Sequence, residues 1–188
     1  MPITPLHYPI AWSLSKLNKK LNFPGLIVGS FIPDIEVPLL IFFFNGVLPD
    51  HFILHSLIGA LTIGTIISTI VTIYLYPLLV TLIFKVDNDR LRDVCKWTPT
   101  LIISCMIGNI FHILLDIPMH PFNPVLWPFV DPYDIIGPLV IFFTTNGNIG
   151  KGFLHANIFT NIIMGLFTIL ILIYYRKNLM SLLLRTEP

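Results

Sequence analysis

The sequence is short of charge. Of its 188 residues, 11 are Lys or Arg and 10 are Asp or Glu, so charged residues make up 11% of the chain, against about a quarter in average soluble proteins. Hydrophobic residues make up 55%, and the mean hydropathy is +0.83. This composition excludes intrinsic disorder and argues against a soluble domain, which needs more charge to cover its surface. The net charge of +1 gives no basic footprint for nucleic acid, so a nucleic-acid partner is not expected.

Common catalytic motifs are missing as well. No Gly-x-Ser-x-Gly is present, which argues against a serine hydrolase with a nucleophile elbow. No glycine-rich phosphate loop is present either. The two cysteines are Cys95, in a charged segment, and Cys105, in an apolar run, and a disulfide between them is not expected.

What the sequence does contain is long apolar stretches. Residues 51–84, 97–115 and 152–175 carry no Asp, Glu, Lys or Arg, and about 20 apolar residues are enough for a helix to cross a bilayer. A further stretch, 23–44, is apolar but interrupted by two prolines and two carboxylates, and 135–145 is apolar but too short to cross. We therefore predict an all-α polytopic integral membrane helical bundle with about four spans, one broken helix and a short re-entrant or interfacial segment.

Basic residues predict how these spans are oriented. They precede the first span, separate the second from the third and follow the fourth: Lys16, Lys19, Lys20, Lys85, Arg90, Arg92, Lys96, Arg176, Lys177 and Arg185. Both termini are then cytoplasmic, because basic residues concentrate in cytoplasmic loops. We expect residues 1–188 to form a single integral membrane domain in a lipid bilayer, in a prokaryotic cell membrane.

Ionisable side chains in or beside the apolar stretches are the candidates for function, because they are costly there. They are all histidines and carboxylates: His7, Asp34, Glu36, His51, His55, His112, Asp116 and His120. Such side chains are the usual ligands of zinc and similar metals. His112 and Asp116 are four residues apart, as are His51 and His55, so each pair shares one face of a helix. For the first pair, the alternative is a histidine at a helix end that is simply paired with the nearby aspartate. For the second pair, the alternative is two histidines at the membrane boundary that face lipid headgroups.

The broken stretch supplies two more candidates. Pro33 interrupts the backbone just before Asp34, and a carboxylate in apolar surroundings needs a cation, a proton or hydrogen bonds. Asp34 is therefore a candidate metal ligand, with a neutral Asp bonded to freed backbone groups as the alternative. Glu36 is a second ligand, a general base or only the outer end of the span. His155, near the start of the last span, is better explained by a structural hydrogen bond.

The order of these motifs resembles a known group of proteins. The segments are Thr4–His7, Gly29–Glu36, His55–Gly59, Gly108–Asp116 and Pro118–Pro128. Together they resemble the membrane-bound metal-dependent hydrolases of the YdjM type and related uncharacterised membrane families. That family is grouped with zinc-dependent phospholipase C and related zinc nucleases.

The resemblance implies a ligand set. Asp34, His55, His112 and Asp116 would hold one ion, and His7 would share a second with Asp116. The later His-x-x-x-Glu of the phospholipase has no equivalent, because Phe159 stands four residues after His155. One or two ions are therefore expected.

The function predicted at this point is a membrane-embedded metal-dependent hydrolase. The expected cofactor is Zn, with Mn as the alternative, and a metal-activated water would attack a phosphoester in a lipid or lipid-linked substrate. Asp34 and Glu36 are the candidate catalytic residues, Asp34 as a ligand and Glu36 as the general base, and His120 is an outer or second-metal ligand. Two alternatives remain: a metal or proton transporter, and a non-catalytic membrane protein with a structural metal site.

Overall fold

The structure consists of helices and loops. It is a computed structural model, and it describes residues 4–45, 49, 51–85, 87–176 and 182–183. It is 78% helical, and no strand is found among the described residues, which confirms the predicted fold class. Within these described ranges, four helices are long and apolar enough to cross a membrane: Phe23–Phe44, Leu57–Phe84, Pro99–Met119 and Ile149–Tyr175.

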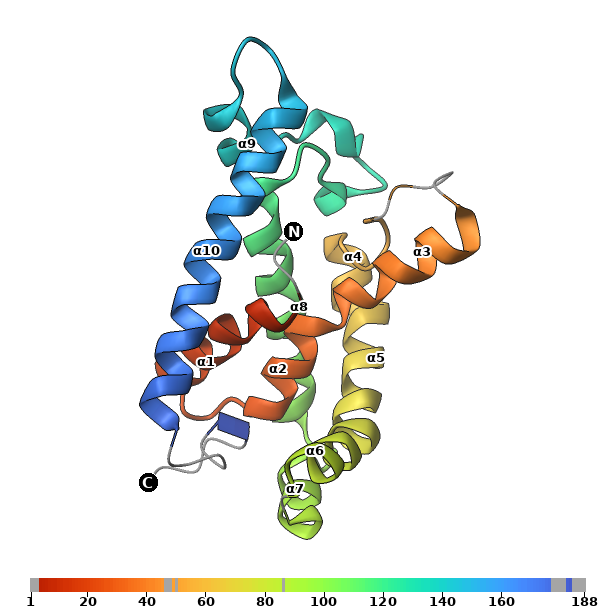
Figure 1. The fold of residues 1–188 in the computed structure, drawn as a ribbon. Helices are drawn as coiled ribbons and strands as arrows, with labels where there is room; N and C mark the ends of the chain where they lie inside the picture. The colour runs from red at the N-terminus through yellow and green to blue at the C-terminus, as the bar shows by residue number, and fades with distance from the viewer. Residues whose placement is uncertain (1–3, 46–48, 50, 86, 177–181, 184–188) are drawn as a thin grey trace.

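The two ends of the bundle differ in character (Figure 1). The loops between helices α8 (Pro99–Asp116) and α10 (Ile149–Tyr175) gather at one end, where α9 (Pro138–Phe143) packs against α10. This short helix is the short segment expected at 135–145. At the other end lie the charged helix α7 (Asn88–Val94) and the end of α10, which Arg176 follows.

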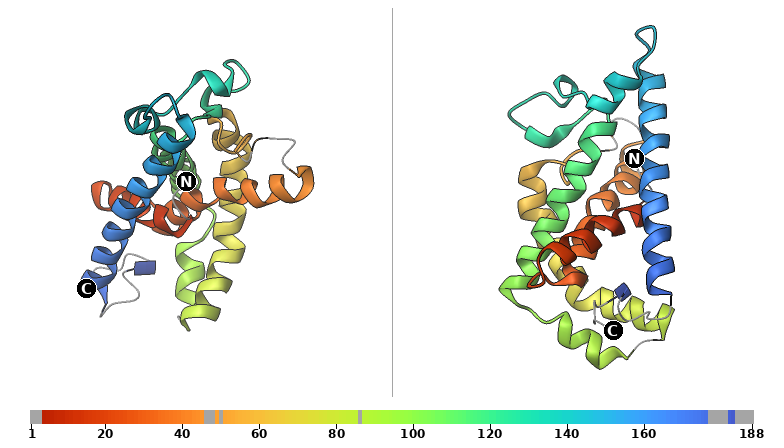
Figure 2. Two further views of the ribbon diagram at one scale, coloured as in Figure 1. Left: turned by 45° about the horizontal axis from the view of Figure 1, so that its top comes forward. Right: turned by 90° about the vertical axis from the view of Figure 1, so that its left-hand side faces the viewer.

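The first candidate span is a broken helix, as predicted. Helix α2 (Phe23–Phe31) is followed by a 3-10 turn at Pro33–Ile35 and then by α3 (Glu36–Phe44). Figures 1 and 2 show that α3 turns away from the direction of α2. Proline lacks an N–H and restricts the residue before it, so a regular helix is interrupted there. The break places Asp34 and Glu36, both buried, where the chain changes direction.

The second span is continuous but irregular. It comprises α4 (Leu57–Gly59), α5 (Thr65–Ile70) and α6 (Tyr76–Phe84), joined by π-helical turns at Ala60–Gly64 and Val71–Leu75. Its first turn is fixed by the side chain of Ser56, which accepts a hydrogen bond from the Gly59 N–H, a typical helix cap. This cap sets the position of His55, the residue immediately before it.

The N-terminal segment enters the bundle. A 3-10 turn at Thr4–His7 leads into α1 (Tyr8–Leu17), which packs against α2 and α10 with Ala11 and Leu14 buried. His7 is completely buried as a result. Figure 2 shows α1 lying beside α10, with its N-terminal end toward the upper half of the bundle.

Candidate metal centre

The site is built on the crossing of α2 and α8, where glycines let the two backbones touch. A Cβ atom on Gly108 would lie 2.7 Å from the carbonyl oxygen of Leu26, and one on Gly29 would overlap the carbonyl of Cys105. Small residues are what allow membrane helices to approach this closely. The crossing brings the break after α2 against the last turns of α8, which carry His112 and Asp116.

His112 is oriented by α2. Its Nδ1 lies 2.8 Å from the carbonyl oxygen of Ser30, and because a carbonyl only accepts, Nδ1 carries the proton. The Nε2 lone pair then faces two carboxylates, 3.2 Å from Asp116 Oδ2 and 3.5 Å from Asp34 Oδ1. An imidazole held by its other nitrogen is the usual arrangement of a metal-binding histidine.

His55 is oriented in the same manner, by Glu36. Its Nδ1 lies 3.1 Å from Glu36 Oε2, and its Nε2 lies 3.7 Å from Asp116 Oδ2 and 4.0 Å from Asp34 Oδ1. The two histidines also face each other, with 3.4 Å between His55 Nε2 and His112 Nε2. Four side chains from three separate segments therefore converge on one point.

The converging side chains form a compact buried group. One ligand atom from each of Asp34, His55, His112 and Asp116 lies within 4.8 Å of all the others. Among the described residues, no group donates a well-aligned hydrogen bond to the four carboxylate oxygens of Asp34 and Asp116, and their nearest polar neighbours are the histidine nitrogens. Two buried carboxylates without donors, facing imidazole lone pairs, are strongly unfavourable unless a cation lies among them. The donor set, two oxygens and two nitrogens, suits zinc and related divalent metals.

His7 lies against this group but outside its compact core. Its ring stacks on that of His112, with 4.1 Å between the centroids. Its Nδ1 is 3.8 Å from Asp34 Oδ2, and its Nε2, for which the described residues offer no well-aligned hydrogen bond, is 3.6 Å from Asp116 Oδ1. The structure thus brings His7 beside both carboxylates, and its role as a ligand of a second ion stays a prediction.

His120 and His51 border the group on the side of the loop that follows α8. The Nδ1 of His120 donates to the Asp116 carbonyl oxygen at 2.9 Å, while its buried Nε2 has no hydrogen-bond partner in the described part of the chain. The His51 ring lies 4.3 Å from that of His55 and 4.8 Å from that of His120, centroid to centroid. Burial lowers the pKa of His55, and that of His120 to about 4, so both rings are neutral at pH 7, the form that binds metal.

Next to these histidines is a very small pocket. His51, His55, Asp116 and His120 line it, and it offers about 10 Å³ to the centre of a water molecule, which is about the least that one water needs. His155 lies elsewhere: it is exposed, and its ring is 6.3 Å from that of Phe143.

The carboxylate of Glu36, the candidate general base, already accepts several hydrogen bonds from the protein. Besides its contact with His55, its carboxylate accepts from the backbone N–H groups of Phe52, Ile53 and Leu54 at 2.6–3.1 Å. A carboxylate held in this way supports a positioning role: it fixes the segment before α4 and aims His55. General-base action by Glu36, one of the roles that its position in the sequence allows, stays a prediction.

Replacing Glu36 with glutamine separates these two roles. The amide keeps the shape but turns an NH₂ group toward donors, so we expect the orientation of His55 to be lost and the metal affinity to fall about 10- to 100-fold. Titration of the metal-free protein with Zn²⁺ would measure this. Unchanged metal affinity together with lost hydrolysis would contradict the positioning role of Glu36 and would support its action as a general base.

The described residues together define a helical protein with four membrane-spanning candidates and a buried His/Asp cluster that could hold a metal ion. The chain belongs to a family described as a domain of unknown function, DUF4184, whose model matches residues 1–127. The matched part contains every candidate ligand of the cluster. No curated protein and no solved structure matches the chain.

Proposed function

We propose that this protein is a membrane-embedded metal-dependent hydrolase, acting on a phosphoester in a lipid or lipid-linked substrate. The observation that carries the proposal is the pair of buried carboxylates, Asp34 and Asp116, that receive no well-aligned hydrogen bond from the described residues and face two oriented imidazoles. Without a cation, two carboxylates buried this close together would be strongly unfavourable. The charge of two carboxylates balances a divalent ion, Zn²⁺ or Mn²⁺, and imidazole binds such an ion in its neutral form.

The chemistry of the proposal combines the ion with the chain's own residues. When bound, such an ion acts as a Lewis acid and lowers the pKa of a coordinated water toward about 7. Asp34, His55, His112 and Asp116 would hold it, and Glu36 and the Ser30 carbonyl would keep the two imidazoles aimed. Space for about one water exists where His55, Asp116 and His120 meet, and the Nε2 of His120 could accept a proton there.

The substrate class rests on the surroundings and on resemblance. The site lies near one end of α8, among helices whose outer faces are apolar, so a molecule held in the bilayer reaches it more easily than a soluble one. The phosphoester is what the resemblance to zinc-dependent phospholipase C implies.

A structural metal site is the second candidate function, and one observation favours it. The cluster offers four protein ligands, which fill the coordination of a tetrahedral zinc and leave no position for water. A six-coordinate ion such as Mn²⁺ keeps open positions with the same ligands. A transporter is less well supported, because the described residues contain one such group of ligands and no second one along the spans.

Metal removal and reloading distinguish these functions. We expect protein purified in mild detergent to contain about one ion per chain, and we expect the metal-loaded protein to hydrolyse a phosphodiester in mixed micelles. Chelation should abolish the hydrolysis and lower the thermal stability, since a ligand that binds only the folded state stabilises it. Zn²⁺ or Mn²⁺ should restore both. Restored stability without any hydrolysis would support the structural metal site. The absence of bound metal after reloading would contradict both the hydrolase and the structural metal site.

A further inference from the structure

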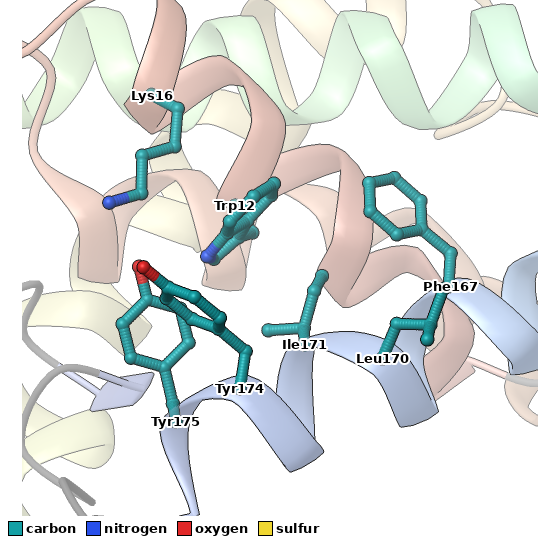
Figure 3. Close-up of a pocket in the computed structure, with 7 residues that line it drawn as sticks. All are labelled: Trp12, Lys16, Phe167, Leu170, Ile171, Tyr174 and Tyr175. Carbon is teal, nitrogen blue, oxygen red and sulfur yellow. The ribbon is translucent and has the colours of Figure 1, made fainter.

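A second pocket lies far from the metal centre, between α1 and the end of α10. Its volume is about 310 Å³, and Figure 3 shows the side chains that line it: Trp12, Lys16, Phe167, Leu170, Ile171, Tyr174 and Tyr175. Phe153, on the same helix α10, contacts His120 beside the metal centre. At 1.5 Å per residue, Tyr175 is about 30 Å further along that helix. The pocket therefore belongs to the opposite, basic end of the bundle.

The polar groups of this pocket are suited to binding an anion. The Nε1 of Trp12 is buried and has no hydrogen-bond partner among the described residues, and an indole N–H can only donate. The Nζ of Lys16 lies 5.8 Å from the centroid of the Trp12 ring and 5.6 Å from that of Tyr175. No ion pair of Lys16 with a carboxylate occurs within the described part of the chain. Figure 3 shows the ammonium, the indole nitrogen and the tyrosine hydroxyls turned toward one another.

The rest of the pocket lining is apolar and is suited to contact with an acyl chain. Phe167, Leu170 and Ile171 form the other part of the wall, and Leu170 and Tyr174 are 64% and 79% exposed. A soluble anion would leave these apolar side chains uncovered, whereas a lipid covers them with its acyl chains. The preference for basic residues at the cytoplasmic face agrees with this, because anionic lipids attract Lys and Arg there.

We propose that this pocket binds an anionic phospholipid of the leaflet at the basic end, with Lys16 and the Trp12 Nε1–H contacting its phosphate. The ring of Tyr175 supports the Lys16 ammonium, and the apolar wall of α10 receives the start of an acyl chain. This inference is independent of the hydrolase proposal, since it concerns different residues at the other end of the molecule.

Quenching of Trp12 fluorescence tests the proposal directly. Trp97→Phe with Trp127→Phe leaves Trp12 as the single tryptophan of the chain. This variant would be placed in phosphatidylcholine nanodiscs that contain a minority of brominated phosphatidylglycerol or, in matched discs, brominated phosphatidylcholine. We expect the brominated phosphatidylglycerol to quench several-fold more strongly, and excess inorganic phosphate to leave the quenching unchanged. Equal quenching by both lipids would overturn the proposal, and reversal by phosphate would show a site for free anions instead.

Two lysine variants make the test specific. Lys16→Gln should lower the preference for phosphatidylglycerol about fivefold, the effect of one lysine at an anionic surface. Lys20→Gln removes the same charge from an exposed position outside the pocket and should leave the preference unchanged. Equal losses in both variants would show general surface attraction and contradict a defined site. If Lys16→Gln does not fold, counting the phosphatidylglycerol that stays bound to the unmodified chain after detergent exchange decides the question, and none retained would refute it.

Discussion

Asp116→Asn is expected to empty the metal centre while leaving the fold in place. The carboxylate of Asp116 lies within 3.2–3.7 Å of nitrogens on His7, His55 and His112, closer to each of these rings than the carboxylate of Asp34 lies. The amide removes one of two negative charges and presents an NH₂ group to the ion. Because changes to residues that only support a ligand already cost about 10- to 100-fold in metal affinity, loss of a ligand should cost at least that. Elemental analysis after dialysis should then find less than about a tenth of an ion per chain.

Asp89→Asn is the matched control for that result. Asp89 is an exposed aspartate on α7, so the same chemical change there should leave the bound metal at its original level. Circular dichroism and gel filtration of both variants would verify that the helical fold is retained. A folded Asp116→Asn variant with undiminished metal content would contradict the assignment of the cluster, and so would an equal loss in the control.

The main features of the fold could be predicted because lipid imposes simple constraints on a sequence. Stretches without charge, such as 152–175, predicted spans, and the prolines around Asp34 predicted the break between α2 and α3; the structure confirms both. The sequence also indicated which side chains would come together. Histidines and carboxylates are the main ionisable residues in and beside the apolar segments, so each candidate ligand was expected to lie near the others. The structure brings Asp34, His55, His112 and Asp116 into one group.

The supporting contacts could not be predicted, because they involve backbone atoms that every residue has. The Ser30 carbonyl that orients His112 is an example, and so are the three N–H groups that hold Glu36. Nothing in the sequence marks which peptide groups will face a carboxylate after folding. One signal was available: Gly29 and Gly108 each lie within a few residues of a candidate ligand, and small residues of this kind indicate a close helix crossing.

That crossing leads to the second large effect, from the addition of a single methyl group. Alanine normally stabilises a helix by about 1 kcal/mol relative to glycine. At Gly29 the new methyl would overlap the backbone of Cys105 on α8, and a backbone cannot move aside as a flexible side chain can. We expect Gly29→Ala to destabilise the protein by about 2–3 kcal/mol, the usual cost of overpacking. Thermal unfolding in detergent would measure this.

Gly29→Ala should also weaken metal binding, although it changes no ligand. Asp34 follows α2 and Asp116 lies on α8, so any separation of the two helices moves the carboxylates apart, and we expect at least a tenfold loss of metal affinity. Gly165→Ala on α10 is the matched control, because a Cβ there meets nothing within 4 Å; it should be neutral or slightly stabilising, with full metal content. If Gly29→Ala unfolds at a lower temperature yet keeps its affinity, the cluster does not depend on the crossing. If both properties fall together, the contact between α2 and α8 is what holds the two halves of the metal centre in place.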